Sequence, residues 1–499
     1  MADRPTSDEK AATGIAGLDE ILGGGLARDR TYLVEGTPGA GKTTVGLQFL
    51  IEGAGRGEAG LYVTLSETAA ELRAVARSHG WSLDNVELFE LVAGEDMLDS
   101  GQQQSLLYSS DLELGETTRA VLERIEASRP ARIVFDGLGE IRLLARGALR
   151  YRRQVLALKH YFAKHGATVL LLDDMSAPEH DLQLHSVAHG VLRLEQLTPA
   201  YGAERRRLSV TKYRGTRYRG GYHDYTIETG GLRVFPRLIA AEHRKPFRGE
   251  VATSGIAEFD ALLGGGLDRG TSTLLIGPAG SGKSLLALHY AVRTAEQGRK
   301  AVAYLFDEDV GLLAERAGGV GIDLDDHVRE GRLALEQVDA AELSPGEFAH
   351  RVRDRVERED ARIVVIDSLN GYYAAMPEEQ FLVLHMHELL SYLNRRGVVT
   401  LLTMAQHGLI GDMRAPADLT YLSDTVLLLR FFEAAGRMRR AISAVKKRSG
   451  AHEDTIREFR VTADGLRLGP PLEEFHGVLR GVPTYVGRQD RQALDDGEA

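Results

Sequence analysis

The hydrophobic positions of the chain form short apolar runs that alternate with longer amphipathic segments. In the first half, four runs rich in Val, Leu and Ile lie at residues 31–36, 60–65, 132–137 and 168–174. Buried parallel strands read as near-continuous apolar runs of this kind. Residues 42–54 and 151–166 instead carry apolar positions at helical spacing. This alternation predicts an α/β fold, in which helices flank a mostly parallel central sheet.

A different pattern follows at residues 207–227, where the sequence becomes polar and rich in β-forming residues. Antiparallel strands commonly have one face in water, which gives them a more polar sequence than buried parallel strands. We therefore predict an antiparallel edge added to the parallel sheet.

The same succession of motifs occurs twice. Residues 13–32 read TGIAGLDEILGGGLARDRTY, and residues 254–273, which lie 241 positions later, read SGIAEFDALLGGGLDRGTST. The spacing narrows to 231 positions between Asp136 and Asp367, as small insertions and deletions in loops would produce. The expected boundaries are a tail at 1–12, a first domain at 13–240, a linker at 241–250, a second domain at 251–472 and a C-terminal segment at 473–499.

The amino-acid composition excludes or disfavours several classes of function. The 499 residues carry a net charge of −11, which disfavours a protein that covers nucleic acid by bulk electrostatics. The sequence contains no cysteine, so disulfides and thiolate metal sites are excluded. The opening MADRPTSDEK lacks the apolar core of a signal peptide, and no apolar run reaches the ~18–20 residues that span a bilayer. We expect a soluble, cytoplasmic protein without a membrane partner.

Each domain carries one phosphate-loop motif of the form GxxxxGK[ST]. The loops read GTPGAGKT and GPAGSGKS, and each lies between an apolar strand and a helical segment. Backbone N–H groups of such a loop surround a phosphate, and Lys42 or Lys283 would reach the β- and γ-phosphates. The residues expected to bind ATP are Gly36, Thr37, Pro38, Gly39, Ala40, Gly41, Lys42, Thr43 and Thr44 in the first domain and Gly277, Pro278, Ala279, Gly280, Ser281, Gly282, Lys283, Ser284 and Leu285 in the second.

Oxygen ligands for Mg²⁺ are expected beside each loop. Thr43 and Ser284 would each place a hydroxyl on the ion. Asp136 and Asp367 end the runs ARIVFD and ARIVVID, so each carboxylate would lie at the carboxyl end of a strand, where ligands bind in such sheets. ATP and Mg²⁺ are therefore the expected cofactors.

Acidic residues that could orient or deprotonate water follow another strand in each half. The first domain offers Glu67, preceded by Ser66, and the second offers the pair Asp307 and Glu308. Two like charges in a dry site raise the pKa of one of them, which suits a proton acceptor. The unequal carboxylates predict two catalytic sites that differ.

Two charged segments, KYR and KKR, could neutralise the negative charge that develops during phosphoryl transfer. The candidate residues are Lys212, Arg214, Lys446 and Arg448. From composition alone, ordinary surface cations are an equal alternative, because Lys and Arg are common at surfaces.

Together these motifs resemble the KaiC family, the circadian-clock ATPases of the RecA-like superfamily. The resemblance covers nearly the whole chain and includes TGIAGLDEILGGGL, both phosphate loops, residues 423–459 and residues 473–487. It implies two tandem RecA-like P-loop NTPase domains in a two-tiered homohexamer, with ATP between subunits. The KxR residues would then reach the γ-phosphate held by a neighbouring subunit, and a KaiB-like or signalling protein would be a partner.

The resemblance also implies an activity for each tier. The first would be a slow ATPase, and the second would also be a Ser/Thr autokinase that removes its own phosphate, so that the ring serves as a regulatory, clock-type switch. The adjacent phosphoacceptors of the family fall on Thr420 and Tyr421. The chain departs from the family pattern at Ser66, which replaces the first carboxylate of the N-terminal pair, and at Asp307, where the family has Glu.

The sequence leaves two other functions open. The basic run at 205–221 favours a DNA-dependent RecA- or RadA-type ATPase, whereas the acidic total makes nucleic acid an unexpected partner. The other alternative is a nucleotide-dependent scaffold with negligible turnover, in which ATP would drive assembly without phosphate release.

Overall fold

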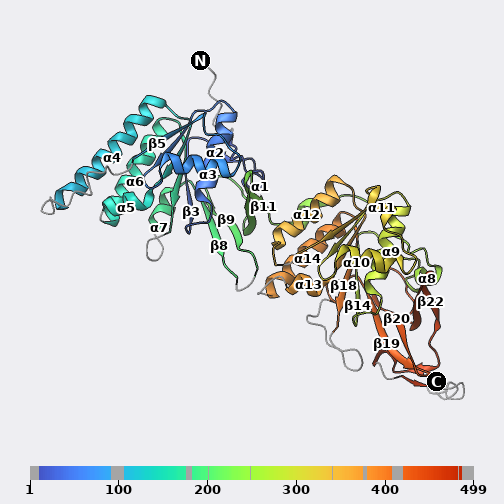
Figure 1. Ribbon diagram of the computed structural model, residues 1–499. Coiled ribbons are helices and arrows are strands. Elements are labelled where there is room, and N and C mark those ends of the chain that lie inside the picture. The colour runs from blue at the N-terminus through green and yellow to red at the C-terminus, as the bar shows by residue number, and fades with distance from the viewer. Residues whose placement is uncertain are drawn as a thin grey trace. The chain divides into compact units, whose positions relative to one another are not determined.

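The computed structural model describes residues 10–91, 106–145, 147–175, 182–199, 202–247, 249–339, 341–374, 379–406, 420–480 and 483–485. The chain divides into two compact units, Met1–Arg237 and Leu238–Ala499 (Figure 1). Each unit contains one nine-stranded mixed sheet with helices on both faces. The prediction of two tandem α/β domains, each with a mostly parallel sheet and an antiparallel edge, is confirmed.

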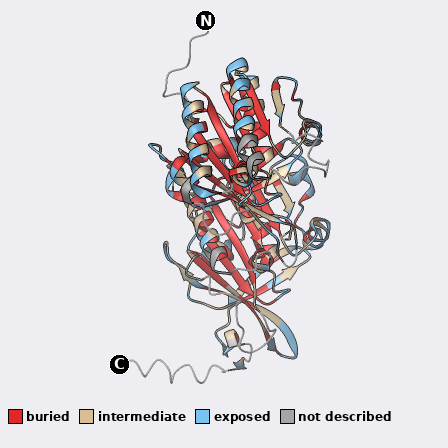
Figure 2. Ribbon diagram, turned by 90° about the vertical axis from the view of Figure 1, so that its left-hand side faces the viewer, coloured by how far each residue is buried: buried red, intermediate tan, exposed pale blue. Residues whose placement is uncertain are grey.

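The sheet of the first unit has the order β11-β10-β9-β8-β3-β7-β6-β4-β5. Its strands are β3 (Thr31–Gly36), β4 (Gly60–Thr64), β5 (Val86–Glu90), β6 (Arg132–Asp136), β7 (Thr168–Asp173), β8 (Gly190–Leu197), β9 (Arg205–Tyr213), β10 (Tyr222–Glu228) and β11 (Gly231–Phe235). The strands from β8 to β5 run parallel, and β9, β10 and β11 continue the sheet antiparallel. The central strands β3, β4 and β7 are buried at every position, which is why they read as unbroken apolar runs (Figure 2).

Helices cover both faces of this sheet. One face packs against α1 (Ala16–Ile21), α2 (Lys42–Gly55) and α3 (Ala69–Ser78). The opposite face packs against α4 (Leu106–Ser128), α5 (Leu138–Ala145), α6 (Ala148–Lys164) and α7 (Leu182–Val187).

The second unit repeats this plan, with the sheet order β16-β15-β17-β18-β14-β19-β20-β21-β22. Its strands are β14 (Ser272–Gly277), β15 (Ala301–Leu305), β16 (Leu333–Gln337), β17 (Ile363–Asp367), β18 (Val399–Ala405), β19 (Thr425–Ala434), β20 (Arg437–Lys447), β21 (Arg457–Thr462) and β22 (Gly465–Pro471). One face packs against α8 (Ala257–Leu262), α9 (Lys283–Glu296) and α10 (Val310–Gly318), with α11 (Asp325–Arg329) beside α9. The other packs against α12 (Pro345–Arg358), α13 (Leu369–Ala374) and α14 (Glu379–Arg395).

Small elements complete the described part of the chain. They are the two-stranded sheets of β1 (Lys10–Ala11) with β2 (Leu26–Ala27), β12 (Val251–Ala252) with β13 (Leu267–Asp268) and β23 (Phe475–His476) with β24 (Thr484–Tyr485), and the 3₁₀ helices η2 (Ala240–His243) and η3 (Val478–Arg480). None of the helices within the described residues has the length and apolar character needed to cross a membrane.

The segment 241–250, predicted as a linker, packs against the second unit. The ring of His243 meets that of Tyr392 edge-on, with 5.2 Å between the ring centroids. Further along, the guanidinium of Arg269 lies 5.6 Å from the centroid of the Phe247 ring. These contacts tie the described residues of the segment to the second domain.

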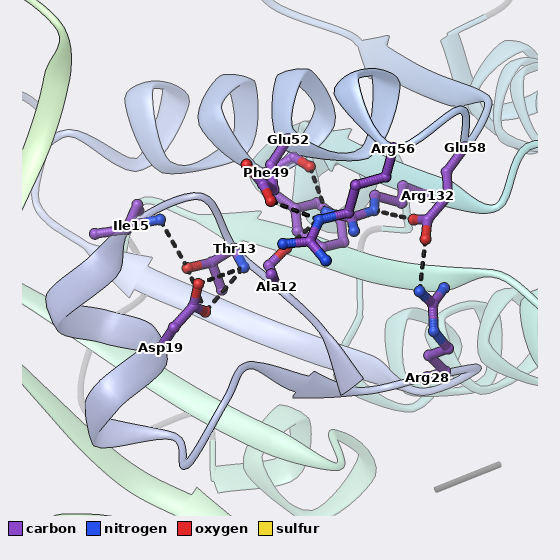
Figure 3. A network of polar contacts seen from close by, with 10 residues as sticks. All are labelled: Ala12, Thr13, Ile15, Asp19, Arg28, Phe49, Glu52, Arg56, Glu58 and Arg132. Carbon is purple, nitrogen blue, oxygen red and sulfur yellow. Dashed lines mark hydrogen bonds and ion pairs between the residues drawn. The ribbon is translucent and has the colours of Figure 1, made fainter. Parts of the chain in front are cut away.

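A buried arginine ties the first residues of β6 to the surrounding segments (Figure 3). Arg132 is fully buried, and its Nε pairs with Glu58, which also pairs with Arg28. The Nη1 of Arg132 donates to the carbonyls of Ala12 at 2.7 Å and Phe49 at 2.8 Å. Because a buried charge is costly unless it is paired, these contacts act together to hold α2 and the N-terminal segment against the sheet.

Candidate nucleotide-binding sites

The first phosphate loop joins the end of β3 to the start of α2. Gly36 closes β3, and α2 begins at Lys42. Gly39 (φ 83°) and Gly41 (φ 91°) adopt the left-handed conformation, which glycine tolerates best. The buried Nζ of Lys42 donates to the carbonyls of Gly36 at 2.8 Å and Thr37 at 3.2 Å. In this strand–loop–helix arrangement, backbone N–H groups at the helix start are available to bind phosphate.

The second loop repeats this geometry between β14 and α9. Gly277 closes β14, and α9 begins at Lys283. Gly280 (φ 74°) and Gly282 (φ 102°) again adopt the left-handed conformation. The Nζ of Lys283 donates to the carbonyls of Gly277 at 2.9 Å and Pro278 at 2.8 Å. Both motifs therefore adopt the strand–loop–helix conformation that their spacing predicted, and phosphate binding by them stays a prediction.

The two loop lysines lie in different electrostatic surroundings. The Nζ of Lys42 forms an ion pair with Oδ1 of Asp174 at 2.6 Å. The strand registers place Ala405 at the corresponding position of the second domain. There, burial lowers the pKa of Lys283 to about 8, against the opposing effect of Asp367. Asp174 was missed in the sequence, because only the register shows that it lies beside the loop.

Asp136, the candidate Mg²⁺ ligand of the first domain, ends β6 and is almost buried. The hydroxyl of Tyr62 donates to Asp136 Oδ2 at 2.5 Å and also contacts the side chain of Thr43. Burial raises the pKa of Asp136 to about 6, although the bond from Tyr62 opposes the shift. The hydroxyl of Tyr62 thus contacts both predicted ligands, Thr43 and Asp136. Oxygen ligands of this kind are the ones that Mg²⁺ prefers.

In the second domain, the hydrogen bond to the strand-end aspartate comes from a different strand. Asp367 ends β17 and accepts a hydrogen bond from the hydroxyl of Thr403 on β18. The position of Tyr62 is taken by Ala303, since each lies opposite the same point of the neighbouring strand. Ser284, the other predicted ligand, is the second residue of α9. Sequence reasoning missed both hydroxyl donors, although the replacement of Tyr62 by Ala303 between the repeats could have indicated the first.

Glu67 lies directly after β4, on the same sheet edge as the phosphate loop. The hydroxyl of Thr64 accepts from the N–H of Glu67 at 3.0 Å and donates to its carbonyl at 2.8 Å, which fixes the backbone. The Oε2 atom of Glu67 is buried and has no hydrogen-bond partner among the residues that the structure describes. Burial, followed by the negative charge of Asp136, raises the pKa of Glu67 to about 6. A buried carboxylate oxygen without a partner is suited to bind water or a proton.

The second domain places its two carboxylates differently. The hydroxyl of Ser368 donates to Oδ2 of Asp307, and Nη2 of Arg316 donates to Oε2 of Glu308 at 2.7 Å. Burial raises the pKa of Glu308, Arg316 opposes the shift and Asp367 adds to it. The perturbation therefore comes from burial and the strand-end aspartate rather than from the adjacent Asp307.

The KxR residues of the first domain bind backbone carbonyls at the end of α7 and just after it, before β8. The Nζ of Lys212 donates to the carbonyls of His185 and, at 2.8 Å, Ala188. The Nη2 of Arg214 donates to the carbonyl of Ser186 at 2.8 Å. The side chains are therefore held in place rather than spread over the surface.

The second domain has the same arrangement before β19. The Nζ of Lys446 donates to the carbonyls of Thr420 at 2.7 Å and Ser423 at 2.8 Å. The Nη2 of Arg448 donates to the carbonyl of Tyr421 at 2.9 Å. The structure thus brings the candidate cations and the candidate phosphoacceptors together.

The strand registers place both KxR segments at the amino-terminal edge of the parallel strands. Tyr213 pairs with Gly190, which pairs with Tyr32 at the start of β3, whereas the phosphate loop begins at the other end of β3. In the second domain, Lys447 pairs with Thr425 at the start of β19. Each KxR segment is therefore at the sheet edge opposite the phosphate loop of its own domain.

The family described as "ATPase: KaiC" matches residues 11–239 and 252–473 of this sequence. The chain belongs to the KaiC ATPase family. It is 27% identical over 503 residues to the circadian clock protein KaiC3 of Synechocystis sp., covering 99% of this chain and 98% of that protein. It is 26% identical to the circadian clock oscillator proteins KaiC of Thermostichus vulcanus over 497 residues and of Synechococcus elongatus over 498 residues, covering 97% of this chain and 94% of each relative.

As a KaiC-family member, the chain consists of two ATPase domains of the RecA-like type whose sites are not copies of each other. In the first site, the loop lysine is paired with Asp174, and one buried oxygen of Glu67 has no partner among the described residues. In the second site, the pKa of the loop lysine is lowered, and both Asp307 and Glu308 accept hydrogen bonds. The two sites share the loop geometry and the strand-end aspartate, and they differ in the partner of the loop lysine and in the surroundings of the acidic residues after β4 and β15.

Proposed function

We propose that this KaiC-family chain hydrolyses ATP with Mg²⁺ at the interfaces between subunits of a homohexamer. The proposal rests mainly on the KxR segments, which lie at the sheet edge opposite the phosphate loop of the same domain. A strand rises about 3.3 Å per residue, so the four residue steps from Tyr32 to Gly36 separate the two edges by roughly 13 Å. Cations held at that edge are suited to the nucleotide of another subunit.

In the first domain, the loop N–H groups and Lys42 would bind the β- and γ-phosphates, and Asp174 would release Lys42 as they arrive. Thr43 and Asp136 would hold Mg²⁺, whose charge would offset that of the phosphates. Glu67 would accept a hydrogen bond or proton from the attacking water, since its buried oxygen has no other partner.

In the second domain, Lys283 would contact the phosphates, and Ser284 with Asp367 would hold Mg²⁺. Glu308 is the better candidate for the base, because its pKa is raised while Asp307 is bound by a serine hydroxyl. Release of Glu308 from Arg316 would be needed first. We therefore expect the two domains to hydrolyse ATP at different rates.

The cations Lys212, Arg214, Lys446 and Arg448 would stabilise the charge that develops on the γ-phosphate of the neighbouring subunit. The backbone carbonyls of Thr420 and Tyr421 accept hydrogen bonds from Lys446 and Arg448, so both residues would lie near the same phosphate. Thr420 is therefore the proposed phosphoacceptor of a Ser/Thr autokinase in the second domain, with Tyr421 as the adjacent candidate. A KaiB-like or signalling protein in the cytoplasm would read the state of the ring.

The test is phosphate release from Mg-ATP by the full chain, with native mass measured in parallel. We expect release to stop in Lys42→Ala/Lys283→Ala and to continue, from one tier, in each single variant. Unchanged release by the double variant would overturn the proposal. ATP-dependent assembly with phosphate release at background would favour the scaffold, and stimulation by single-stranded DNA would favour the DNA-dependent motor.

A mixing experiment tests the placement between subunits. Lys42→Ala/Lys283→Ala subunits keep their KxR cations, and Lys212→Ala/Lys446→Ala subunits keep their phosphate loops. If the cations act on a neighbour, mixed rings regain activity that neither variant has alone. No recovery in rings of verified mixed composition would contradict this arrangement.

A further inference from the structure

His185 and Glu35 form a carboxylate–imidazole pair beside the first phosphate loop. The Nε2 atom of His185 lies 2.7 Å from Oε2 of Glu35. Glu35 is buried at the end of β3 and directly precedes Gly36, the first residue of the loop. The corresponding residue of the second domain is Ile276, so the pair is specific to the first domain.

The hydrogen bond fixes which nitrogen of His185 is available. A carboxylate only accepts hydrogen bonds, so Nε2 carries a proton, and the neutral form of the ring has its lone pair on Nδ1. The side chain of His185 is 30% exposed, and Nδ1 has no hydrogen bond to any described residue. Glu35 therefore orients the imidazole so that Nδ1 is the ring nitrogen turned away from the carboxylate.

His185 also stands where Thr420 stands in the second domain. Lys212 donates to the carbonyls of His185 and Ala188, just as Lys446 donates to those of Thr420 and Ser423. The next residues match as well, since Arg214 binds the carbonyl of Ser186 and Arg448 binds that of Tyr421. The equivalence rests on these bonds, because the two segments have no common sequence pattern.

We infer that His185 is a second phosphoacceptor, which takes the γ-phosphoryl group of ATP bound by a neighbouring subunit. The inference rests on the proposed function, because it needs the KxR segment to face that nucleotide. Lys212 and Arg214, held beside His185, would neutralise the charge of the group in transfer. The first domain would then carry its own covalent mark, separate from Thr420.

The step balances with ATP as the only co-reactant. A bond forms between Nδ1 of His185 and the γ-phosphorus, while the bond from that phosphorus to the bridging oxygen breaks and its electron pair leaves with ADP. The Nε2 proton stays between His185 and Glu35. Water later cleaves the nitrogen–phosphorus bond, which releases phosphate and restores the imidazole.

The test uses the full chain with γ-labelled Mg-ATP, quenched in parallel in acid and in alkali. Phosphohistidine is lost in acid and survives alkali, whereas phosphothreonine survives acid. We expect alkali-stable, acid-labile label on the peptide that contains His185, abolished in His185→Gln and retained in Thr420→Ala. His160→Gln, which changes an exposed histidine of α6 bonded to a backbone carbonyl, should leave the label unchanged. Glu35→Gln should slow labelling about tenfold or more, because the orienting carboxylate is lost.

Two results would overturn the inference. One is the absence of acid-labile label in the wild type while it hydrolyses ATP, which leaves the proposed function standing. The other is the absence of acid-labile label on the His185 peptide when Lys42→Ala and His185→Gln subunits are mixed in rings of verified composition, because transfer between subunits requires label on the Lys42→Ala chain. Failure of the wild type to hydrolyse ATP at all would instead count against the proposed function.

Discussion

The Nζ of Lys42 lies 2.6 Å from Oδ1 of Asp174, so the lysine of the first phosphate loop is paired with a carboxylate. The second loop has the same backbone conformation, but Ala405 takes the position of Asp174. The two loops therefore share one motif and one backbone conformation, but only in the first must an incoming phosphate replace a carboxylate as the partner of the loop lysine. This difference leads to the first of five predictions.

Asp174→Ala should strengthen nucleotide binding at the first site. The carboxylate competes with phosphate for Lys42. Because Asp174 is exposed and solvent screens its charge, we take the pair as worth about 0.2–1 kcal/mol, so the Kd should fall by up to about five-fold. The measurement is titration with a fluorescent ATP analogue in a Lys283→Ala background. The matched change Ala405→Asp in a Lys42→Ala background should weaken binding at the second site. An increase in Kd for Asp174→Ala would mean that Asp174 supports binding instead.

Hydrolysis by the first domain should decline as the pH falls through about 6. Glu67 must be ionised to accept a proton, and burial with the charge of Asp136 raises its pKa to about 6. The check is the pH profile of phosphate release between pH 5 and 8 in the Lys283→Ala variant, with Glu67→Gln expected to be inactive throughout. A flat profile would exclude Glu67 as the base.

The same pKa shift has a consequence for stability. The pKa of Glu67 is higher in the folded state than in the unfolded state. Ionisation of Glu67 therefore lowers the free energy of unfolding, and this stability is lost as the pH rises through about 6. Glu67→Gln removes this cost. Its melting temperature should therefore exceed that of the wild type at pH 7.5, and the gain should be smaller at pH 5.

Arg132→Met should destabilise the first domain by about 3 kcal/mol. The change leaves the buried carbonyls of Ala12 and Phe49 without their donor and removes one of the two partners of Glu58 (Figure 3). Denaturant unfolding of the full chain measures it, with Arg56→Ala, an exposed pair on α2, as a control expected within about 0.5 kcal/mol. An equal effect of both variants would show that burial of Arg132 is not the cause.

Phe247→Ala should loosen the segment at 241–250 and lower the stability of the second domain alone. The ring packs where side chains at Gly270 and Gly397 would clash with it, and it stacks near Arg269. Because Phe247 is 40% exposed, loss of its ring should cost only about 1 kcal/mol. Limited trypsin digestion should then cut faster at Arg244, whereas Leu149→Ala, an exposed residue of α6, should behave like the wild type. Unchanged cleavage would mean that Phe247 does not anchor the segment.

Features that depend on a few adjacent residues could be predicted from the sequence. The spacing of Gly36, Gly41 and Lys42 determines a strand, a left-handed turn and a helix start, and the structure has all three. The internal repeat likewise predicted two domains of one plan, and the apolar runs became the central parallel strands. Each of these follows from backbone conformation or from burial of one segment, which neighbouring residues largely decide.

The partners of the site residues could not be found in this way. Tyr62 and Asp136 are 74 positions apart, and Glu35 and His185 are 150 apart, yet each pair is joined by a hydrogen bond. The hydroxyl beside the strand-end aspartate comes from β4 in the first domain and from β18 in the second, although the motifs are the same.

The sequence by itself thus determined the two phosphate loops, the α/β class and the duplication. Only the tertiary structure decided which charges meet at each loop, that the KxR cations lie at the opposite edge of the sheet, and that His185 takes the place of Thr420. The physical reason is that loop geometry is set by local backbone preferences, whereas the pKa and the partner of a side chain depend on strands that are brought side by side only by folding.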